Sequence, residues 1–215
     1  MTRYNEDEEF EGTASPLGFT VTPNTSHNFR VHINTDIKGP EHYARVFEML
    51  LDAGPEDVVH FLISSPGGRA DGLTNLLEGI KLTEAFVVGV IVGDASSAAS
   101  ILALNCHDVV VLDGAQMLCH TARTGFGGKH PDLEAYTAHS KKVTEKLLRS
   151  TYEGFLNEEE LHSVIKGGEL YLDADEIRAR LENRAAYFTQ MEEDAETQRD
   201  TDVQPPKRGS KSKKV

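Results

Sequence analysis

Short apolar runs alternate along the chain with longer segments in which apolar residues recur every three or four positions. The short runs predict buried strands, and the longer spacing predicts helices with one apolar face. The predicted strands cover residues 29–33, 58–63, 86–92, 109–112 and 116–119, and the predicted helices cover 71–84, 97–104 and 132–156, with another helix that Pro40 opens and Gly54-Pro55 closes. Strands that alternate with helices are typical of an α/β domain with a largely parallel sheet.

A last helix has a start signal of its own. Asp173 can cap it, and Glu176, three residues on, can reciprocate, which is the spacing of a capping box. The apolar residues that recur at near-helical spacing behind this cap are Ile177, Leu181, Phe188 and Met191. This stripe favours ordinary packing within the domain, and a partner-binding face is the alternative.

The composition limits what the protein binds and where it works. In 215 residues, 22 Lys and Arg against 35 Asp and Glu give a formal net charge of −13, which argues against general binding to nucleic acid or anionic membranes. The longest apolar run, 85–93, is far shorter than the ~20 residues of a membrane-spanning helix. The first residues lack the apolar core of a secretory signal, and two cysteines cannot form a disulfide framework. We therefore expect a cytoplasmic protein.

The two ends of the chain differ from its middle. Residues 1–26 form an arm that contains the acidic run Glu6-Asp7-Glu8-Glu9, and residues 199–215 form a tail that becomes basic from Lys207. Both ends are predicted to be disordered, and they flank a single domain at 27–198. The tail is interpreted as a solvated terminus, with weak docking or nucleic-acid contact as the alternative.

Two strand-to-turn junctions carry the residue types of a hydrolytic site. The turn Ser65-Pro66-Gly67-Gly68 follows a buried strand, and its backbone N–H groups could stabilise an oxyanion, but the glycines alone favour a simple tight turn. Ser97 begins a small-residue helix after the next strand, a position that suits a nucleophile. Its position alone, however, favours helix capping by Ser96 or Ser97.

A nucleophilic serine needs a general base and a carboxylate that orients the base. His120 ends a predicted strand, so its ring can project at the strand's mouth. Glu169, Asp173 and Asp175 are all possible acids, and the residue pattern alone does not choose among them. We expect no metal site, because neither Cys106-His107 nor Cys119-His120 can chelate through both members when neighbours on a strand point to opposite faces.

Five segments, taken in order, resemble the proteolytic subunit of the Clp protease (ClpP), and most closely the divergent ClpP-like proteins of bacteriophages. They are Phe61 to Gly68, Gly93 to Ser97, Met117 to His120, Gly125 to Gly128, and Glu169 to Glu176. The resemblance covers about residues 31–181. It implies a ClpP/crotonase-type superhelix of ββα units, with the long helix as a handle through which two heptameric rings meet.

The resemblance also implies a site and an activity. Ser97 falls on the family's nucleophile, His120 on its general base, and the amides of Gly68 and Ala98 on its oxyanion hole. Glu169 stands where the family usually carries aspartate, and Ala98 stands where it usually carries methionine. The implied protein is a serine endopeptidase that cuts peptide or protein substrates inside a homo-oligomeric chamber and needs no cofactor.

The resemblance leaves several functional alternatives open. The chamber could be fed by a Clp-type AAA+ ATPase that unfolds substrates, or the peptidase could act on a phage substrate such as capsid scaffold during head maturation. A catalytically inactive ring subunit would keep the fold without turnover. A crotonase-type acyl-CoA enzyme would use the same fold and a glycine oxyanion hole, with Ser97 and His120 idle.

Overall fold

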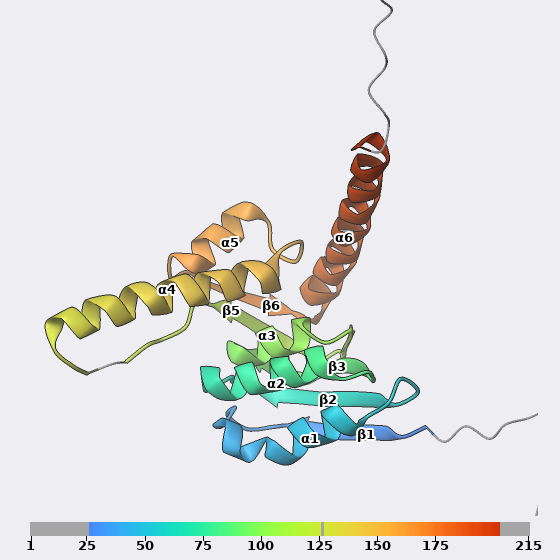
Figure 1. Cartoon of the computed structure of the whole chain (residues 1–215), viewed down its shortest axis with the longest axis horizontal. Coiled ribbons are helices and arrows are strands. Elements are labelled where there is room, and N and C mark those ends of the chain that lie inside the picture. The colour runs from blue at the N-terminus through green and yellow to red at the C-terminus, as the bar shows by residue number, and fades with distance from the viewer. Residues whose placement is uncertain (1–25, 126, 203–215) are drawn as a thin grey trace, which may run out of the picture.

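Six strands form one sheet in the order β1-β2-β3-β5-β6, with β4 also paired to β3 (Figure 1). A computed structural model describes residues 26–125 and 127–202. The strands are β1 (Asn28–Ile33), β2 (Val58–Ser65), β3 (Phe86–Ser96), β4 (Asp108–Val111), β5 (Gln116–His120) and β6 (Glu169–Asp173). The helices are α1 (Ala44–Asp52), α2 (Ala70–Leu82), α3 (Ala98–Leu104), α4 (His130–Tyr152), α5 (Glu158–Ile165) and α6 (Ala174–Asp202), with a 3₁₀ turn, η1 (Pro40–His42), before α1. The predicted α/β class is confirmed.

Strand β3 organises the sheet because two strands share one of its edges. Residues 88–91 of β3 pair with β4, and residues 94–96 pair with β5. All pairings are parallel except that of β5 with β6, so the predicted largely parallel sheet is confirmed. The pairing with β5 also explains why β3 runs to Ser96, past the predicted end at residue 92.

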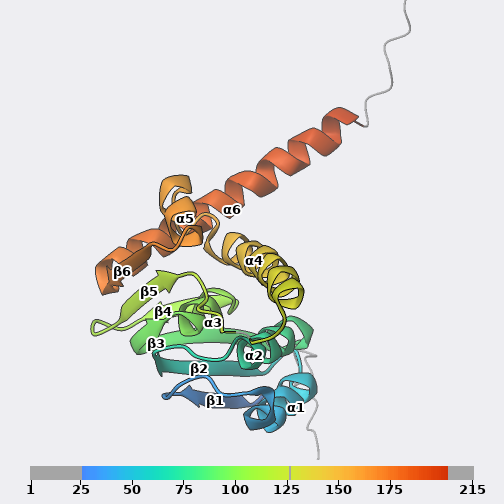
Figure 2. The same ribbon diagram turned by 90° about the vertical axis from the view of Figure 1, so that its left-hand side faces the viewer.

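One part of the core lies between the sheet and the first three helices, and the same cluster continues to α4, α5 and α6 through Leu148, Leu161 and Ile177. Alternate residues of β2, namely Val59, Phe61 and Ile63, are fully buried, as the strand period requires. Helices α1 and α2 lie on that face (Figure 2), and α3 packs on β3 beside α2. Leu76 of α2 and Leu102 of α3 are fully buried in the same cluster.

Helices α4 and α5 differ most from the sequence expectation. Helix α4 ends at Tyr152 rather than at residue 156, because Gly154 takes a φ of 72° and turns the chain. Helix α5 was not predicted. Its start has a full capping box, in which the Asn157 side chain accepts from the Glu160 N–H and the Glu160 carboxylate accepts from the Asn157 N–H. The outer part of α4 projects from the body of the molecule (Figure 1).

Helix α6 begins at the predicted capping box and leaves the body of the molecule. The Asp173 carboxylate accepts from the Glu176 N–H at 2.9 Å, and the Glu176 carboxylate accepts from the Asp173 N–H at 3.0 Å. The predicted apolar stripe packs only at its start, since Ile177 is fully buried whereas Met191 is 48% exposed. Figure 2 shows the far half of α6 extending away from the sheet.

The predicted ends of the chain fall mostly outside the described residues. Helix α6 continues to Asp202, past residue 199 where the predicted tail begins. The arm at 1–25 and the rest of the tail at 203–215 are not described. Within the part of the chain that the structure describes, no helix is long and apolar enough to cross a membrane.

Candidate active site

Four neighbouring segments bring the predicted site residues to the same end of the sheet's strands. Strands β2, β3 and β5 are adjacent and parallel, so their carboxyl ends lie together. Strand β6 begins at that same end, because it runs antiparallel to β5. Gly68 follows β2, Ser97 follows β3, His120 ends β5 and Glu169 begins β6. The sheet order therefore places turn, serine, histidine and acid side by side in that sequence.

Ser97 occupies a strained turn between β3 and α3. Its φ of 58° makes it the single non-glycine residue with positive φ among residues 26–125 and 127–202. Such backbone conformations cost on the order of 1–3 kcal/mol and persist where the surroundings impose them. The Ser97 N–H is held by the Leu118 carbonyl of β5 at 2.8 Å. This bond ties the serine to the strand that carries His120.

Capping does not explain the serines at this junction. The Ser97 side chain makes no capping hydrogen bond to α3, and the Ser96 hydroxyl donates to the Asp94 carboxylate instead. The Ser97 carbonyl, by contrast, accepts from the Ser100 N–H at 3.1 Å and the Ile101 N–H at 3.3 Å. The hydroxyl of Ser97 is therefore not used for capping.

The glycine turn approaches Ser97 closely. Gly67 has a φ of 94°, and a Cβ added there would lie 2.7 Å from the Ser97 Cβ and 2.9 Å from the Ala98 N. Gly68 forms a parallel bridge with Ile37, in which the Ile37 N–H donates to the Gly67 carbonyl and the Ile37 carbonyl accepts from the Arg69 N–H. In a bridge of this pattern the N–H of the middle residue points to the opposite side. The Gly68 N–H therefore faces the β3 side, where Ser97 and Ala98 lie.

His120 and Glu169 are direct partners in the antiparallel pairing of β5 with β6. Side chains of such partners lie on the same face of a sheet, within reach of each other. The Glu169 carboxylate is nonetheless engaged elsewhere, because it accepts from the Tyr171 hydroxyl at 2.9 Å and from the Arg123 guanidinium at 3.4 Å. Within the described residues, no hydrogen bond joins His120 to Glu169 or to Ser97.

Two side chains, Tyr171 and Arg123, donate hydrogen bonds to the Glu169 carboxylate. The pKa of the Tyr171 hydroxyl is raised because that hydroxyl donates to the Glu169 carboxylate, which favours the neutral phenol. Arg123 is 86% exposed, so its ion pair with Glu169 is screened by water and weak. Tyr171 is 68% exposed as well, so both contacts lie in water, and the bond from Tyr171 is the shorter of the two.

A buried hydroxyl pair lies behind Ser97 and was not predicted. The Ser100 hydroxyl donates to the Ser97 carbonyl at 2.7 Å and lies 2.7 Å from the hydroxyl of Tyr152, the last residue of α4. The buried thiol of Cys119, next to His120, interacts with the same tyrosine. Ser100 is close to Ser97 in sequence, but Tyr152 is 52 residues from Ser100, and no local pattern links them.

The two cysteines, Cys106 and Cys119, do not have the readily ionised thiols of metal ligands or nucleophiles. Burial raises the pKa of the Cys119 thiol to about 12 and that of the Cys106 thiol to about 12, so both stay protonated near neutral pH. Among the described residues, no group of three or more His, Cys, Asp and Glu side chains is placed to hold a metal ion.

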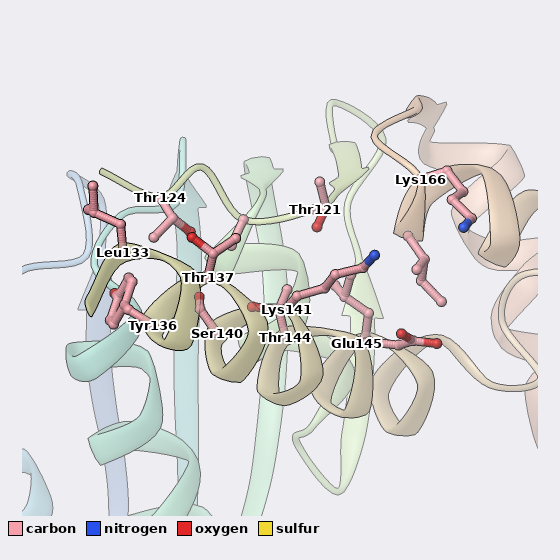
Figure 3. A pocket seen from close by; sticks show the side chains of 13 residues that line it. Thr121, Thr124, Leu133, Tyr136, Thr137, Ser140, Lys141, Thr144, Glu145 and Lys166 are labelled. Atoms are coloured by element: carbon pink, nitrogen blue, oxygen red, sulfur yellow. The ribbon is translucent and has the colours of Figure 1, made fainter. Parts of the chain in front are cut away.

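A groove of about 440 Å³ begins next to His120 and runs along α4 (Figure 3). One wall is the segment after β5, which includes Thr121 and Thr124, and the other is the α4 face that carries Thr137 and Lys141. Ile165 and Lys166 line the end nearest α5. Hydroxyl groups, aliphatic side chains and a few charges line the groove together.

Comparison with models of known protein families finds one that matches this chain. The family described as Clp protease matches residues 23–164. The match includes Gly68, Ser97, Ala98 and His120, and it ends before Glu169. A comparison with curated protein sequences found no significant match.

Proposed function

The chain belongs to the Clp protease family, and from this premise we propose that it is a serine endopeptidase whose nucleophile is Ser97. The observation that carries the proposal is the strained turn at Ser97, which holds the half-buried serine beside two backbone N–H groups. The Ala98 N–H follows the nucleophile directly, and the Gly68 N–H faces it across the Gly67 contact. Two such donors form an oxyanion hole.

His120 and Glu169 complete the proposed mechanism. His120 takes the Ser97 proton as the hydroxyl oxygen attacks the peptide carbonyl, and it then returns the proton to the leaving amine. Gly68 and Ala98 donate to the oxyanion of the tetrahedral intermediate. Glu169 would hold the imidazole in the tautomer that accepts this proton, after its carboxylate turns from Tyr171 toward its cross-strand partner.

The groove beside His120 supports an extended polypeptide as the substrate. It continues from the strand that carries the base, and its hydroxyl-bearing side chains can bond to peptide groups along an extended chain. The charged side chains that line the groove are Lys141, Lys166 and Glu145, so a strongly basic segment is disfavoured there.

The projecting handle supports an oligomeric chamber. Val143 on α4 is 52% exposed, and apolar side chains on a projecting helix need a partner surface. We propose that copies of this chain form a ring or a double ring, of heptamers as the family resemblance implies, with the sites facing inward. A Clp-type AAA+ ATPase partner, a role in phage head maturation and a cytoplasmic location belong to the same proposal.

A catalytically inactive ring subunit is the second candidate. It is favoured by the Glu169 carboxylate, which is bonded to Tyr171 and Arg123 in the described structure. If that arrangement persists in the oligomer, His120 would lack its orienting carboxylate. The two candidates differ in whether Ser97 reacts as an activated nucleophile.

Labelling with a fluorophosphonate, read as intact mass on the assembled protein, separates these candidates. We expect one adduct per chain in the wild type and none in Ser97→Ala or His120→Ala. Ser64→Ala, which removes an exposed hydroxyl from β2, is the matched control and should label like the wild type. An unlabelled wild type in a confirmed oligomer would favour the inactive subunit, and labelling that survives Ser97→Ala would overturn Ser97 as the nucleophile.

A further inference from the structure

Two buried hydroxyl groups support the backbone of the proposed nucleophile from behind. Ser100 and Tyr152 are both fully buried, and their hydroxyl oxygens lie 2.7 Å apart. Ser100 comes from the first turn of α3, whereas Tyr152 is the last residue of α4. A buried hydroxyl that loses its partner costs free energy, so this pair constrains both helices.

The direction of the hydrogen bonds follows from counting hydrogens. A serine hydroxyl has one hydrogen, and that of Ser100 is donated to the Ser97 carbonyl at 2.7 Å. The bond between Ser100 and Tyr152 then uses the phenol hydrogen, so Tyr152 donates and Ser100 accepts, and the protonated Cys119 thiol is the donor in its own interaction with the phenol oxygen. The chain of bonds runs from the Tyr152 hydroxyl through the Ser100 hydroxyl to the Ser97 carbonyl, and donors in such a chain strengthen one another.

The end of this chain lies on the peptide group that carries a proposed oxyanion donor. The Ser97 carbonyl and the Ala98 N–H belong to one planar trans peptide, so they point in opposite directions. A group that holds the carbonyl inward therefore aims the N–H outward, toward the Gly67 side of the site. The Ser97 carbonyl also accepts from the backbone N–H groups of Ser100 and Ile101, at 3.1 and 3.3 Å, so the Ser100 hydroxyl adds a third donor to the support that α3 already gives this peptide.

We propose that Ser100 and Tyr152 are positioning residues, which hold the Ser97–Ala98 peptide so that its N–H points at the oxyanion. The proposal rests on the proposed function of Ser97 as a nucleophile. It also gives the inner end of α4 a role in the site, because Tyr152 contacts both the Ser97 support and Cys119, the neighbour of His120. The other parts of α4 line the groove.

The reaction with a fluorophosphonate tests the proposal without a known substrate. In that reaction the Ser97 oxygen forms a bond to phosphorus, fluoride leaves, and the serine proton passes to His120. The phosphoryl oxygen gains negative charge where the peptide oxyanion would, so donor alignment affects the maximal rate of labelling. The concentration that gives half-maximal labelling reports mainly on non-covalent binding, which the two buried hydroxyls do not touch.

Three variants and one control separate positioning from simple support of the fold. The variants are Ser100→Ala, Tyr152→Phe and the double variant, and the control is Thr151→Val. Thr151 is also fully buried, and its hydroxyl accepts from the Asn105 side chain rather than from the Ser97 support. The control thus removes a neighbouring buried hydroxyl from the same helix.

We expect Ser100→Ala to lower the maximal labelling rate by about tenfold, less than the 10²–10³ seen when an oxyanion donor is deleted outright. Tyr152→Phe should lower it by about threefold, and it should have no further effect in the Ser100→Ala background, because the two hydroxyls act in series. Half-maximal concentrations should not change. Thr151→Val should label at the wild-type rate.

Stability should follow a different pattern from reactivity. Ser100→Ala leaves the Tyr152 hydroxyl buried without its acceptor, so its midpoint of urea unfolding should fall. The double variant removes both hydroxyls and should recover much of that midpoint while its labelling stays slow. If labelling instead recovers with stability, or if Ser100→Ala labels at the wild-type rate, the positioning role is overturned.

The proposed function can fail separately. Labelling that persists in Ser97→Ala overturns Ser97 as the nucleophile, and the positioning proposal that depends on it falls as well. Labelling that requires Ser97 but is unaffected by Ser100→Ala and Tyr152→Phe overturns the positioning proposal alone.

Discussion

His120 and Glu169 are opposite each other in the antiparallel β5–β6 pair, yet the Glu169 carboxylate is bonded to the Tyr171 hydroxyl. Catalytic hydrogen bonds often form fully only when substrate is bound. The structure therefore combines a register that suits a histidine–carboxylate pair with a competing bond that holds the carboxylate aside.

Removal of that competing bond should speed the reaction. A hydrogen bond of this kind contributes about 1 kcal/mol, so Tyr171→Phe should raise the rate of fluorophosphonate labelling by roughly threefold to tenfold. Glu169→Gln should lower the rate by about 10² or more, because the imidazole loses the carboxylate that sets its tautomer. A Glu169→Gln variant that labels like the wild type would show that Glu169 does not orient His120.

The backbone strain at Ser97 should appear as a stability difference between two inactive variants. Glycine adopts a φ of 58° without the steric cost that a Cβ brings, whereas alanine keeps that cost. We expect Ser97→Gly to be more stable than Ser97→Ala by about 1 kcal/mol in urea unfolding. Equal stability of the two variants would mean that the turn is not strained.

Gly67 should tolerate no side chain. A Cβ at this position would lie 2.6 Å from the Ser96 carbonyl oxygen and 2.7 Å from the Ser97 Cβ, with φ at 94°. We expect Gly67→Ala to abolish labelling and to reduce the free energy of unfolding by more than about 2 kcal/mol. Gly114→Ala is the matched control, because a Cβ there meets nothing within 4 Å, and it should leave both properties unchanged.

Acid should weaken the junction between α5 and α6. The Arg180 guanidinium makes two hydrogen bonds to the Glu160 carboxylate, at 2.7 and 2.8 Å, and it lowers the pKa of Glu160 below its ordinary value of 4.5. A lowered folded pKa contributes stability that is present above pH 4.5 and is lost as the pH falls through the folded value.

The comparison for this junction is Glu160→Gln. Glutamine keeps the capping box at the start of α5 but removes the charge. The Tm of the wild type should exceed that of Glu160→Gln at pH 7, and the difference should shrink as the pH falls below 4.5. A difference that stays constant across this range would rule out the ion pair as its cause.

Much of the fold follows from local patterns. The apolar runs of β2 and β3 and the capping box at Asp173 were predicted because strand period and helix capping depend on residues close in sequence. The capping box of α5 depends on the same kind of local signal, in Asn157 and Glu160, and the helix could have been found from it. The segment is short, so its apolar periodicity is weak.

The sequence by itself determined the family, the α/β class, and the placement of Ser97 and Gly68 at strand-to-turn junctions, because each depends on neighbours along the chain. Only the tertiary structure decided that Glu169 is opposite His120, that Tyr171 holds its carboxylate, and that Tyr152 supports Ser97 through Ser100. Strand register and buried hydrogen bonds join residues far apart in the chain. They are set by how the whole core packs, which no local pattern encodes.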